Sequence, residues 1–345
     1  MTSVGREMSK QLHDLSANTG VLSRLEVVVK EALLHYDVDP SSIVTLLNVS
    51  ENATYLVQGS HGKYVMRVHR LGYHSLTEIT SELAWLEALK SEAVVNTPPV
   101  ISSRLGEEVV SISFSGELRH CVMFGFVEGA ELLPLEAGEA FVILGELAAK
   151  MHGHAKAWTF PSAFRRFSWD LDASFGKEAR WGSYKDGISV DSELRALFER
   201  AESNIRSRLL AYGTDSSRFG LIHADMRLSN LLWNGSGEVC VIDFDDCGFG
   251  WYFYDLAAAL SFIEHRPEVP KLIAAWMEGY RKFGTVSKVD EDEIETFVMM
   301  RRLLLIGWIG SHTVADISKE LGGGYTTETA ALAENYLSRW NARSI

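Results

Sequence analysis

The sequence predicts an α+β fold in which a small β-rich lobe precedes a larger, mainly helical lobe. Between residues 40 and 128, short apolar alternations are separated by polar and glycine-containing turns, which is typical of antiparallel strands. From about residue 136 the apolar residues recur with a helical period, and one β-rich stretch at 219–244, expected to form a hairpin, interrupts them. The predicted organisation is an N-terminal extension and helix (1–39), an N-lobe (40–128) and a C-lobe (129–345).

The N-lobe is expected to contain several strands and one strong helix. Ser75 and Glu78 form a capping-box pattern, in which each side chain bonds a free backbone N–H of the first helical turn. A helix is therefore expected from residue 75 until shortly before Pro98-Pro99. The strands expected around it cover residues 43–49, 54–57, 63–70, 108–113 and 120–127.

The C-lobe is expected to be built from long helices. Their predicted ranges are 136–157, 191–212, 268–283, 290–312 and 326–342. Glycine clusters at 235–237, 248–250 and 322–324 do not open a strand-to-helix phosphate loop, so we interpret them as turns.

Composition and charge exclude several classes of protein. Of the 345 residues, 46% are hydrophobic and 23% are charged, which is typical of a soluble globular protein rather than a disordered one. The net charge is −13 and no block of Lys and Arg occurs, so we expect no nucleic-acid partner. The three cysteines form no C-x-x-C pair, which argues against a zinc cluster or a disulfide framework.

The N-terminal sequence and the longest apolar run near the C-terminus predict a cytoplasmic protein without a membrane partner. The N-terminus lacks the apolar stretch of a secretory signal. The apolar run at 303–310 is far too short to cross a bilayer.

The residues that carry chemistry are expected in the β-rich stretch at 219–244. Asp225, Asn230 and Asp243 lie where the chain leaves two apolar strands. Their oxygen atoms suit Mg²⁺, which also shares phosphate oxygens, and an aspartate ahead of two such ligands can accept the proton of an attacking hydroxyl. The spacing H-x-D-x-x-x-x-N, which begins at His223, followed by a strand-end aspartate is that of phosphoryl-transfer enzymes. The alternative is that these are ordinary turn residues beside a hairpin, and we interpret His223 itself as structural.

On these residues the sequence resembles the aminoglycoside phosphotransferase, choline kinase and homoserine kinase superfamily, which has a protein-kinase-like fold. The similarity is greatest to stress response kinase A and type II homoserine kinases. The strand-end motif reads IDFDD at 242–246 instead of the protein-kinase DFG, which matches the small-molecule branch of the superfamily and stress response kinase A. The resemblance implies that Asp225 is the catalytic base and that Asn230 and Asp243 bind Mg²⁺. It also implies that Asp255 buttresses the catalytic loop.

The N-lobe departs from the common kinase pattern at the position of the phosphate-binding lysine. Alternation along the strand at 63–70 places Val65 and Arg67 on one face, where related kinases carry a small apolar residue and a lysine. An arginine keeps the charge and offers a bidentate fork to phosphate. On the following helix, Glu82 is the only acid within the apolar arc, so we expect it to pair with Arg67. The alternative is that Glu82 snorkels to solvent, and we interpret Lys63 as solvated.

Two further N-lobe segments are interpreted as nucleotide-binding. The turn containing Ser50 and Asn52 resembles the N-x-x-E-N turn of stress response kinase A, although an ordinary hairpin turn fits equally well. The apolar strand at 121–129 occupies the place of the superfamily's hinge, so Phe124, Phe126 and Val127 are expected at the adenine. A core strand and turn are compatible with the same residues.

The predicted function is ATP- and Mg²⁺-dependent transfer of the γ-phosphate to a hydroxyl of a small polar molecule. An amino alcohol, a hydroxy amino acid or an aminoglycoside-like compound would fit. The alternatives are a protein Ser/Thr kinase resembling stress response kinase A and a nucleotide-binding pseudokinase, which the arginine at position 67 keeps open. The sequence does not settle the oligomeric state.

Candidate groups lining the acceptor site are Trp169, Asp170, Asp172, Trp251, Tyr254, Arg301, Trp308 and His312. Among them, Arg301 could clamp an acceptor carboxylate or could be a structural feature only.

Overall fold

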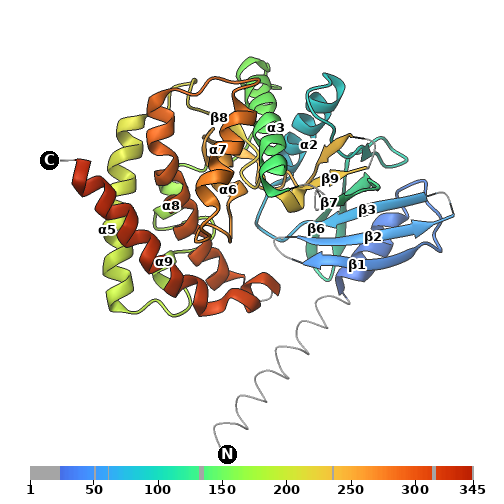
Figure 1. Ribbon diagram of the computed structural model, residues 1–345. Helices are drawn as coiled ribbons and strands as arrows, with labels where there is room; N and C mark the ends of the chain where they lie inside the picture. Colours follow the sequence, from blue (N-terminus) through green and yellow to red (C-terminus); the bar gives the residue numbers. More distant parts are fainter. Residues whose placement is uncertain are drawn as a thin grey trace, which may run out of the picture. The chain divides into compact units, whose positions relative to one another are not determined.

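The structure, a computed structural model, describes residues 24–49, 52–60, 62–131, 136–234, 237–312 and 316–343. The chain divides into two compact units. Unit 1 comprises residues 1–83 and 98–126, and unit 2 comprises residues 84–97 and 127–345. The N-terminal region contains a β-sheet and the C-terminal region is mainly helical, so the predicted fold class is confirmed (Figure 1).

Unit 1 is built on an antiparallel sheet packed against a helix at residues 24–33. Alternate residues of β2 are buried, and they pack with one face of that helix in a continuous apolar core. The pairing order is β1-β2-β3-β6-β4, and β5 also pairs with β6. The strands are β1 (Ile43–Val49), β2 (Ala53–Gly59), β3 (Gly62–Val68), β4 (Val100–Ile101), β5 (Val109–Phe114) and β6 (Glu117–Gly125).

The predicted capping box begins helix α2 (Leu76–Ser91). The backbone N–H of Ser75 donates to Glu78 Oε2 at 2.7 Å, and the N–H of Glu78 donates to Ser75 Oγ at 3.3 Å. One face of the helix is buried through Ile79, Leu83, Leu86 and Leu89, as its apolar period predicted.

Unit 2 contains the remaining helices, and each predicted long helix is present. They are α3 (Ala137–Ala157), α4 (Leu171–Phe175), α5 (Ser192–Tyr212), α6 (Tyr254–Ala259), α7 (Val269–Tyr280), α8 (Lys288–Ser311) and α9 (Asp316–Arg343). Helix α9 begins ten residues earlier than the predicted 326, and it bends at Gly322, whose φ of 46° is left-handed. Helices α5, α8 and α9 lie side by side (Figure 1). In the described part of the chain, no helix combines the length and apolar character needed to span a bilayer.

Two glycines allow α3 and α7 to pack closely. A Cβ atom on Gly145 would overlap the carbonyl oxygen of Trp276, and one on Gly279 would overlap that of Val142. Close approach of the two backbones therefore requires glycine at both positions. This packing matters for the site, because α3 carries the buried His152, which bonds Asp255, and Asp255 in turn bonds the backbone of the predicted catalytic loop.

The β-rich stretch of unit 2 forms two small sheets instead of one hairpin. Strand β8 (Phe219–Ile222) pairs with β11 (Gly248–Trp251), while β9 (Leu231–Trp233) pairs with β10 (Val239–Val241) and β7 (Ala130–Glu131). The prediction of a turn at 248–250 was therefore wrong. Gly248 serves close packing, since a Cβ there would lie 2.7 Å from the carbonyl oxygen of Phe167.

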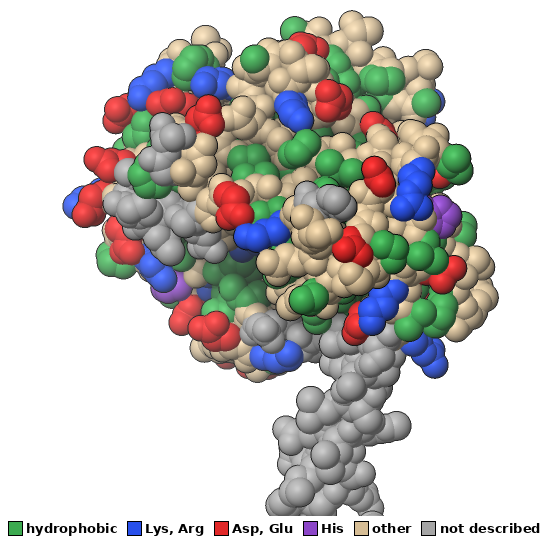
Figure 2. Space-filling model, turned by 90° about the vertical axis from the view of Figure 1, so that its right-hand side faces the viewer, with side chains coloured by type: hydrophobic (Ala, Val, Ile, Leu, Met, Phe, Trp, Pro, Cys, Tyr) green, Lys and Arg blue, Asp and Glu red, His purple; other side chains and the backbone are tan. Residues whose placement is uncertain are grey.

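Charged side chains of both signs are interspersed on the face shown in Figure 2. The chain carries 46 acidic and 33 basic residues, and on this face neither sign gathers into a continuous field.

Candidate active site

The predicted catalytic loop leaves β8 at Ile222 and ends in a single 3-10 turn, Leu228–Asn230, that leads into β9. Ala224 lies in the left-handed region at φ 66°, a conformation that costs free energy for a residue with a side chain. Strain of this kind persists only where surrounding contacts enforce it, and the loop's contacts do so.

The carboxylate of Asp225 is held by three side chains. Arg301 Nη2 donates to Oδ1 at 2.7 Å, Arg227 Nε donates to Oδ2 at 3.1 Å, and Asn230 Nδ2 donates to Oδ2 at 2.9 Å. The residue is only 9% exposed. A buried carboxylate with these partners has a fixed orientation and a defined charge.

The electrostatic surroundings keep Asp225 ionised. Burial by itself would raise its pKa, but the neighbouring charges of Arg227 and Arg301 outweigh burial and hold the pKa of this carboxyl below its usual range. The group is therefore a weak base near neutral pH, and it is suited to orient a hydroxyl before accepting its proton late in the reaction.

Behind the loop, Asp255 on α6 binds the backbone. Its Oδ1 accepts the N–H of Ala224 at 2.7 Å, and its Oδ2 accepts the N–H of His223 at 3.2 Å. The buttressing contacts implied by the resemblance are present. His152 on α3 bonds the same carboxylate through Nε2 at 2.9 Å, while its Nδ1 lies 3.1 Å from the hydroxyl of Tyr280. Burial lowers the pKa of His152, so this chain of contacts contains a neutral imidazole.

The contacts of His223 agree with its interpretation as a structural residue. Its Nδ1 accepts the backbone N–H of Asp225 at 3.3 Å, and its Nε2 lies 3.1 Å from the carbonyl oxygen of Ile242. The ring is fully buried and ties the loop to the end of β10.

The two candidate metal ligands lie on adjoining segments. The backbone N–H of Ile242 donates to the carbonyl of Asn230 at 2.9 Å, and Asp243 follows directly. Asp243 is exposed and has a φ of 62°, a left-handed conformation that aspartate tolerates better than most residues. Asn230 donates its amide N–H groups to the carbonyl oxygen of Asp225 at 2.8 Å and to its carboxylate, so only its side-chain oxygen is available as a candidate metal ligand.

This donor set fits a hard cation. The described residues contain no group of three or more His, Cys, Asp or Glu side chains placed to hold a metal ion. One carboxylate and one amide oxygen match the sparse protein ligation of Mg²⁺, which keeps waters and takes further oxygens from substrate phosphates.

In unit 1 the predicted ion pair is formed. Arg67 Nη2 lies 2.7 Å from Glu82 Oε1, and the two side chains are 7% and 1% exposed. Glu82 does not snorkel to solvent. The Arg67 guanidinium also lies 5.2 Å from the ring centroid of Phe124, while Lys63 is exposed at the start of the strand.

The structure places the predicted adenine-binding residues in a well-bonded segment. Val65 pairs with Phe124 in the sheet register. The N–H of Gly125 donates to the carbonyl of Pro99 at 2.8 Å, and the N–H of Phe126 donates to that of Lys63 at 3.2 Å. These two N–H groups are thus used within unit 1. Val127, which begins the second part of unit 2, is half-buried.

The predicted phosphate turn is only partly described. Ser50 lies outside the described residues. Asn52 is 8% exposed, and its side-chain oxygen accepts the backbone N–H of Arg70 at 3.1 Å. The side chain of Asn52 therefore ties the turn to Arg70, two residues beyond β3, which agrees with the ordinary-turn interpretation.

Of the two interpretations of Arg301, an acceptor clamp or a structural feature, the contacts in the structure do not support the clamp. Besides Asp225, its guanidinium donates to Ser261 Oγ at 3.0 Å, to the carbonyl of Ala224 at 3.1 Å and to the hydroxyl of Tyr254 at 3.1 Å. With four such bonds and 2% exposure, it is not placed to clamp an acceptor carboxylate.

The other acceptor candidates are mostly core residues. Trp169, Trp251, Tyr254, Trp308 and His312 are all less than 9% exposed. Asp170 caps the short helix α4 by accepting the N–H groups of Asp172 and Ala173. Arg227, which bonds the carboxylate of Asp225, was not among the predicted site residues, although its place two residues after Asp225 could have indicated it.

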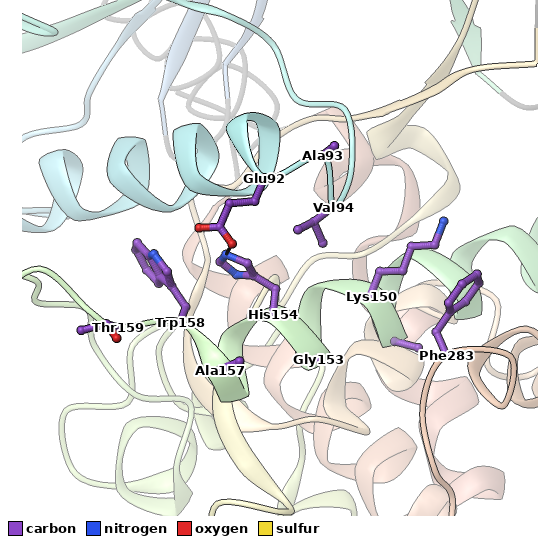
Figure 3. Close-up of a pocket in the computed structure, with 11 residues that line it drawn as sticks. Glu92, Ala93, Val94, Lys150, Gly153, His154, Ala157, Trp158, Thr159 and Phe283 are labelled. Atoms are coloured by element: carbon purple, nitrogen blue, oxygen red, sulfur yellow. Dashed lines mark ion pairs between the residues drawn. The ribbon is translucent and has the colours of Figure 1, made fainter.

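Unit 2 also has a surface pocket of about 880 Å³ that contains none of the predicted site residues. An ion pair between Glu92 and His154, with atoms 3.5 Å apart, lies within it between the end of α2 and α3 (Figure 3). The Lys150 ammonium lies 4.5 Å from the ring centroid of Phe283 on its other side.

Comparison with known proteins gives consistent matches. The model of the phosphotransferase enzyme family matches residues 43–291. A solved microcompartment-associated aminopropanol kinase is 43% identical, with a TM-score of 0.85 over 91% of this chain and 98% of that chain.

More distant relatives are also kinases. Amicoumacin kinase of Bacillus subtilis is 22% identical over 316 residues, which cover 87% of this chain and 90% of the relative. A structure of an amicoumacin kinase in complex with AMP-PNP, Ca²⁺ and Ami is 21% identical and shares the fold, with a TM-score of 0.74 over 91% of this chain and 96% of that chain.

Proposed function

The chain belongs to the phosphotransferase enzyme family, and from this premise we propose that it is a kinase that transfers the γ-phosphate of ATP to the hydroxyl group of a small amino alcohol. Membership of the family confirms the superfamily that the loop motif predicted. The observation that carries the proposed reaction is the fixed, ionised carboxylate of Asp225 at the head of the H-x-D-x-x-x-x-N loop.

The reaction proposed for this loop is a direct displacement at phosphorus. The acceptor hydroxyl oxygen forms a bond to the γ-phosphorus, the bond from that phosphorus to the β–γ bridging oxygen breaks, and ADP leaves with the electron pair. The hydroxyl proton passes to Asp225. The chain's contribution is to orient the hydroxyl through this carboxylate and to hold the carboxylate still.

For the cation we propose Mg²⁺, held by the side-chain oxygens of Asn230 and Asp243. When bound, the ion neutralises charge on the nucleotide phosphates. The two residues supply their ligands from segments already joined by the bond from the Ile242 N–H to the Asn230 carbonyl.

For unit 1 we propose that Arg67, fixed by Glu82, contacts the phosphates that are not transferred. Support comes from the buried ion pair. The guanidinium of Arg67, on β3, is held in position by the carboxylate of Glu82, on α2. Val65, Phe124, Phe126 and Val127 remain proposals for the adenine and Asn52 for the turn, with the Phe126 N–H already engaged.

The acceptor class is tested by ADP release from the purified protein with Mg²⁺-ATP. We expect the highest kcat/KM with aminopropanol or ethanolamine, because the 43% identical relative is an aminopropanol kinase. The comparison set contains hydroxy amino acids, an aminoglycoside, a sugar and a generic protein substrate. A higher kcat/KM with the protein substrate would favour the protein-kinase alternative, and a higher value with homoserine would overturn the amino-alcohol proposal.

The role of Arg67 gives a separate prediction. Arg67→Ala should raise the KM for ATP and lower kcat together, on the order of tenfold each, because the phosphates lose both binding and alignment. Arg67→Lys should retain more activity, since it keeps the charge and loses only the fork. Steady-state kinetics with varied ATP measures both effects.

The partner residue provides the internal check. Glu82→Ala should show a weaker form of the same defect, and the double variant should be non-additive because both changes remove one arrangement. Normal ATP kinetics in folded Arg67→Ala protein would show that another group binds the phosphates.

A further inference from the structure

Helix α8 carries two adjacent buried arginines that contact different parts of unit 2. Arg301 and Arg302 are 2% and 0% exposed. Arg302 bonds Glu264 Oε2 at 2.8 Å, Thr329 Oγ1 at 2.8 Å and the carbonyl of Tyr325 at 3.0 Å. These contacts join α8 to α9 and to the segment after α6. Arg301 instead bonds the catalytic loop. Comparing variants of the two arginines therefore distinguishes the loss of a purely structural contact from the loss of a contact to Asp225.

The guanidinium of Arg301 binds the loop at two points and is itself fixed at two others. Its Nη2 donates to Asp225 Oδ1 at 2.7 Å and its Nη1 to the carbonyl of Ala224 at 3.1 Å. Its Nε donates to Ser261 Oγ at 3.0 Å, and Nη1 also donates to the hydroxyl of Tyr254 at 3.1 Å. The Trp181 ring, whose centroid is 4.7 Å from the guanidinium carbon, packs beside it.

We propose that Arg301 is a positioning residue for phosphotransfer, whose guanidinium fixes the carboxylate of Asp225 and the strained Ala224 peptide in the orientation that receives the acceptor hydroxyl. This inference rests on the proposed role of Asp225. The remaining contacts of Asp225 constrain Oδ1 less than Arg301 does. Asn230 Nδ2 bonds Oδ2, and Arg227 Nε lies 3.1 Å from both oxygens on a side chain that is 29% exposed. Loss of the Arg301 fork therefore lets the carboxylate rotate while the loop backbone stays anchored by Asp255.

A lysine cannot reproduce this arrangement. Its single ammonium has no planar fork, so it cannot bond the carboxylate, the carbonyl, the hydroxyl of Tyr254 and Ser261 in the same directions. A displacement of about 1 Å at a catalytic group can cost on the order of a hundredfold in rate. We expect Arg301→Lys to lower kcat by about tenfold or more and to change the KM for ATP less than about twofold.

The experiment is a double-mutant cycle with Asp225→Asn. If Arg301 acts through the Asp225 carboxylate, Arg301→Lys lowers kcat in the Asp225 protein but alters the residual kcat of Asp225→Asn less than about twofold. An equal loss in both backgrounds would show a general structural role and would overturn the proposal. An unchanged kcat in the Asp225 protein would overturn it as well.

Arg302→Lys is the matched control, because it changes the same residue type at the next position of α8 with similar burial. It should lower the melting temperature without lowering kcat of the folded protein, and an equal kcat loss in both lysine variants would count against the proposal. If Arg301→Lys does not fold, Ser261→Ala combined with Tyr254→Phe removes two guanidinium contacts and keeps the charge, and the same cycle is run with that pair. The double substitution Ser261→Ala, Tyr254→Phe should lower kcat severalfold in the protein that has Asp225. It should leave the residual kcat of Asp225→Asn unchanged.

A second readout does not depend on turnover. Crystal structures of Arg301→Lys and Arg302→Lys should show the Asp225 carboxylate rotated away from its wild-type position in the first variant only. If the wild-type protein phosphorylates no acceptor, the proposed function fails, whereas the carboxylate position still decides this inference. An unmoved Asp225 carboxylate in Arg301→Lys would overturn it.

Discussion

Asp225→Asn should lower kcat for phosphotransfer by about 10²- to 10⁴-fold, the usual contribution of a general base, and should leave the Kd for nucleotide nearly unchanged. The amide of asparagine is nearly the same shape as the carboxylate, but it keeps only one acceptor oxygen, so it can accept from Arg301 or from Asn230 and not from both. What disappears is the negative charge that accepts the hydroxyl proton. The loss should therefore appear in kcat, measured at saturating concentrations of acceptor and ATP.

The experiment combines ADP release with nucleotide binding by calorimetry and a thermal denaturation curve. The denaturation curve is needed because the substitution leaves the buried guanidinium of Arg301 without an anionic partner, which costs stability. Asp191→Asn is a suitable control, since Asp191 caps α5 by accepting backbone N–H groups and asparagine caps as well as aspartate. Wild-type turnover in folded Asp225→Asn protein would remove the assigned role.

The local patterns of the sequence predicted much of the fold. Strand β1 occupies the predicted 43–49, and the capping box at Ser75 begins α2, because alternation and capping are properties of neighbouring residues. The Arg67–Glu82 pair could also be predicted, since a lone acid on an apolar helix face needs a cation and the adjacent strand offered one.

Contacts between distant segments could not be predicted in the same way. Arg301 and Asp225 are 76 positions apart, and no local pattern states that an arginine on α8 points into the catalytic loop. The pairing of β8 with β11 was missed because the glycines of β11 suggest a turn, whereas Gly248 and Gly250 in fact leave room for Phe167 and Ile222. In both cases tertiary packing determined the role of a residue whose local preference suggested another.

Asp243→Asn should raise the Mg²⁺ concentration needed for half-maximal nucleotide binding by tenfold or more, on the order of the loss seen when metal sites lose supporting groups. Asparagine is the informative substitution because it tolerates the left-handed φ of 62° that position 243 requires, whereas alanine would add backbone strain to the loss of the ligand. Asn230→Ala would test the metal ligand less specifically, because Asn230 also donates two hydrogen bonds to Asp225.

The measurement is a Mg²⁺ titration of ATP binding. The control variant is Asp215→Asn, which changes an exposed turn aspartate of the same unit. Since Asp243 is exposed and its backbone lies at the end of β10, folding should be little affected, so a shifted titration reports the ligand itself. An unchanged Mg²⁺ dependence in Asp243→Asn would place the cation on other groups and would separate the metal assignment from that of the catalytic base.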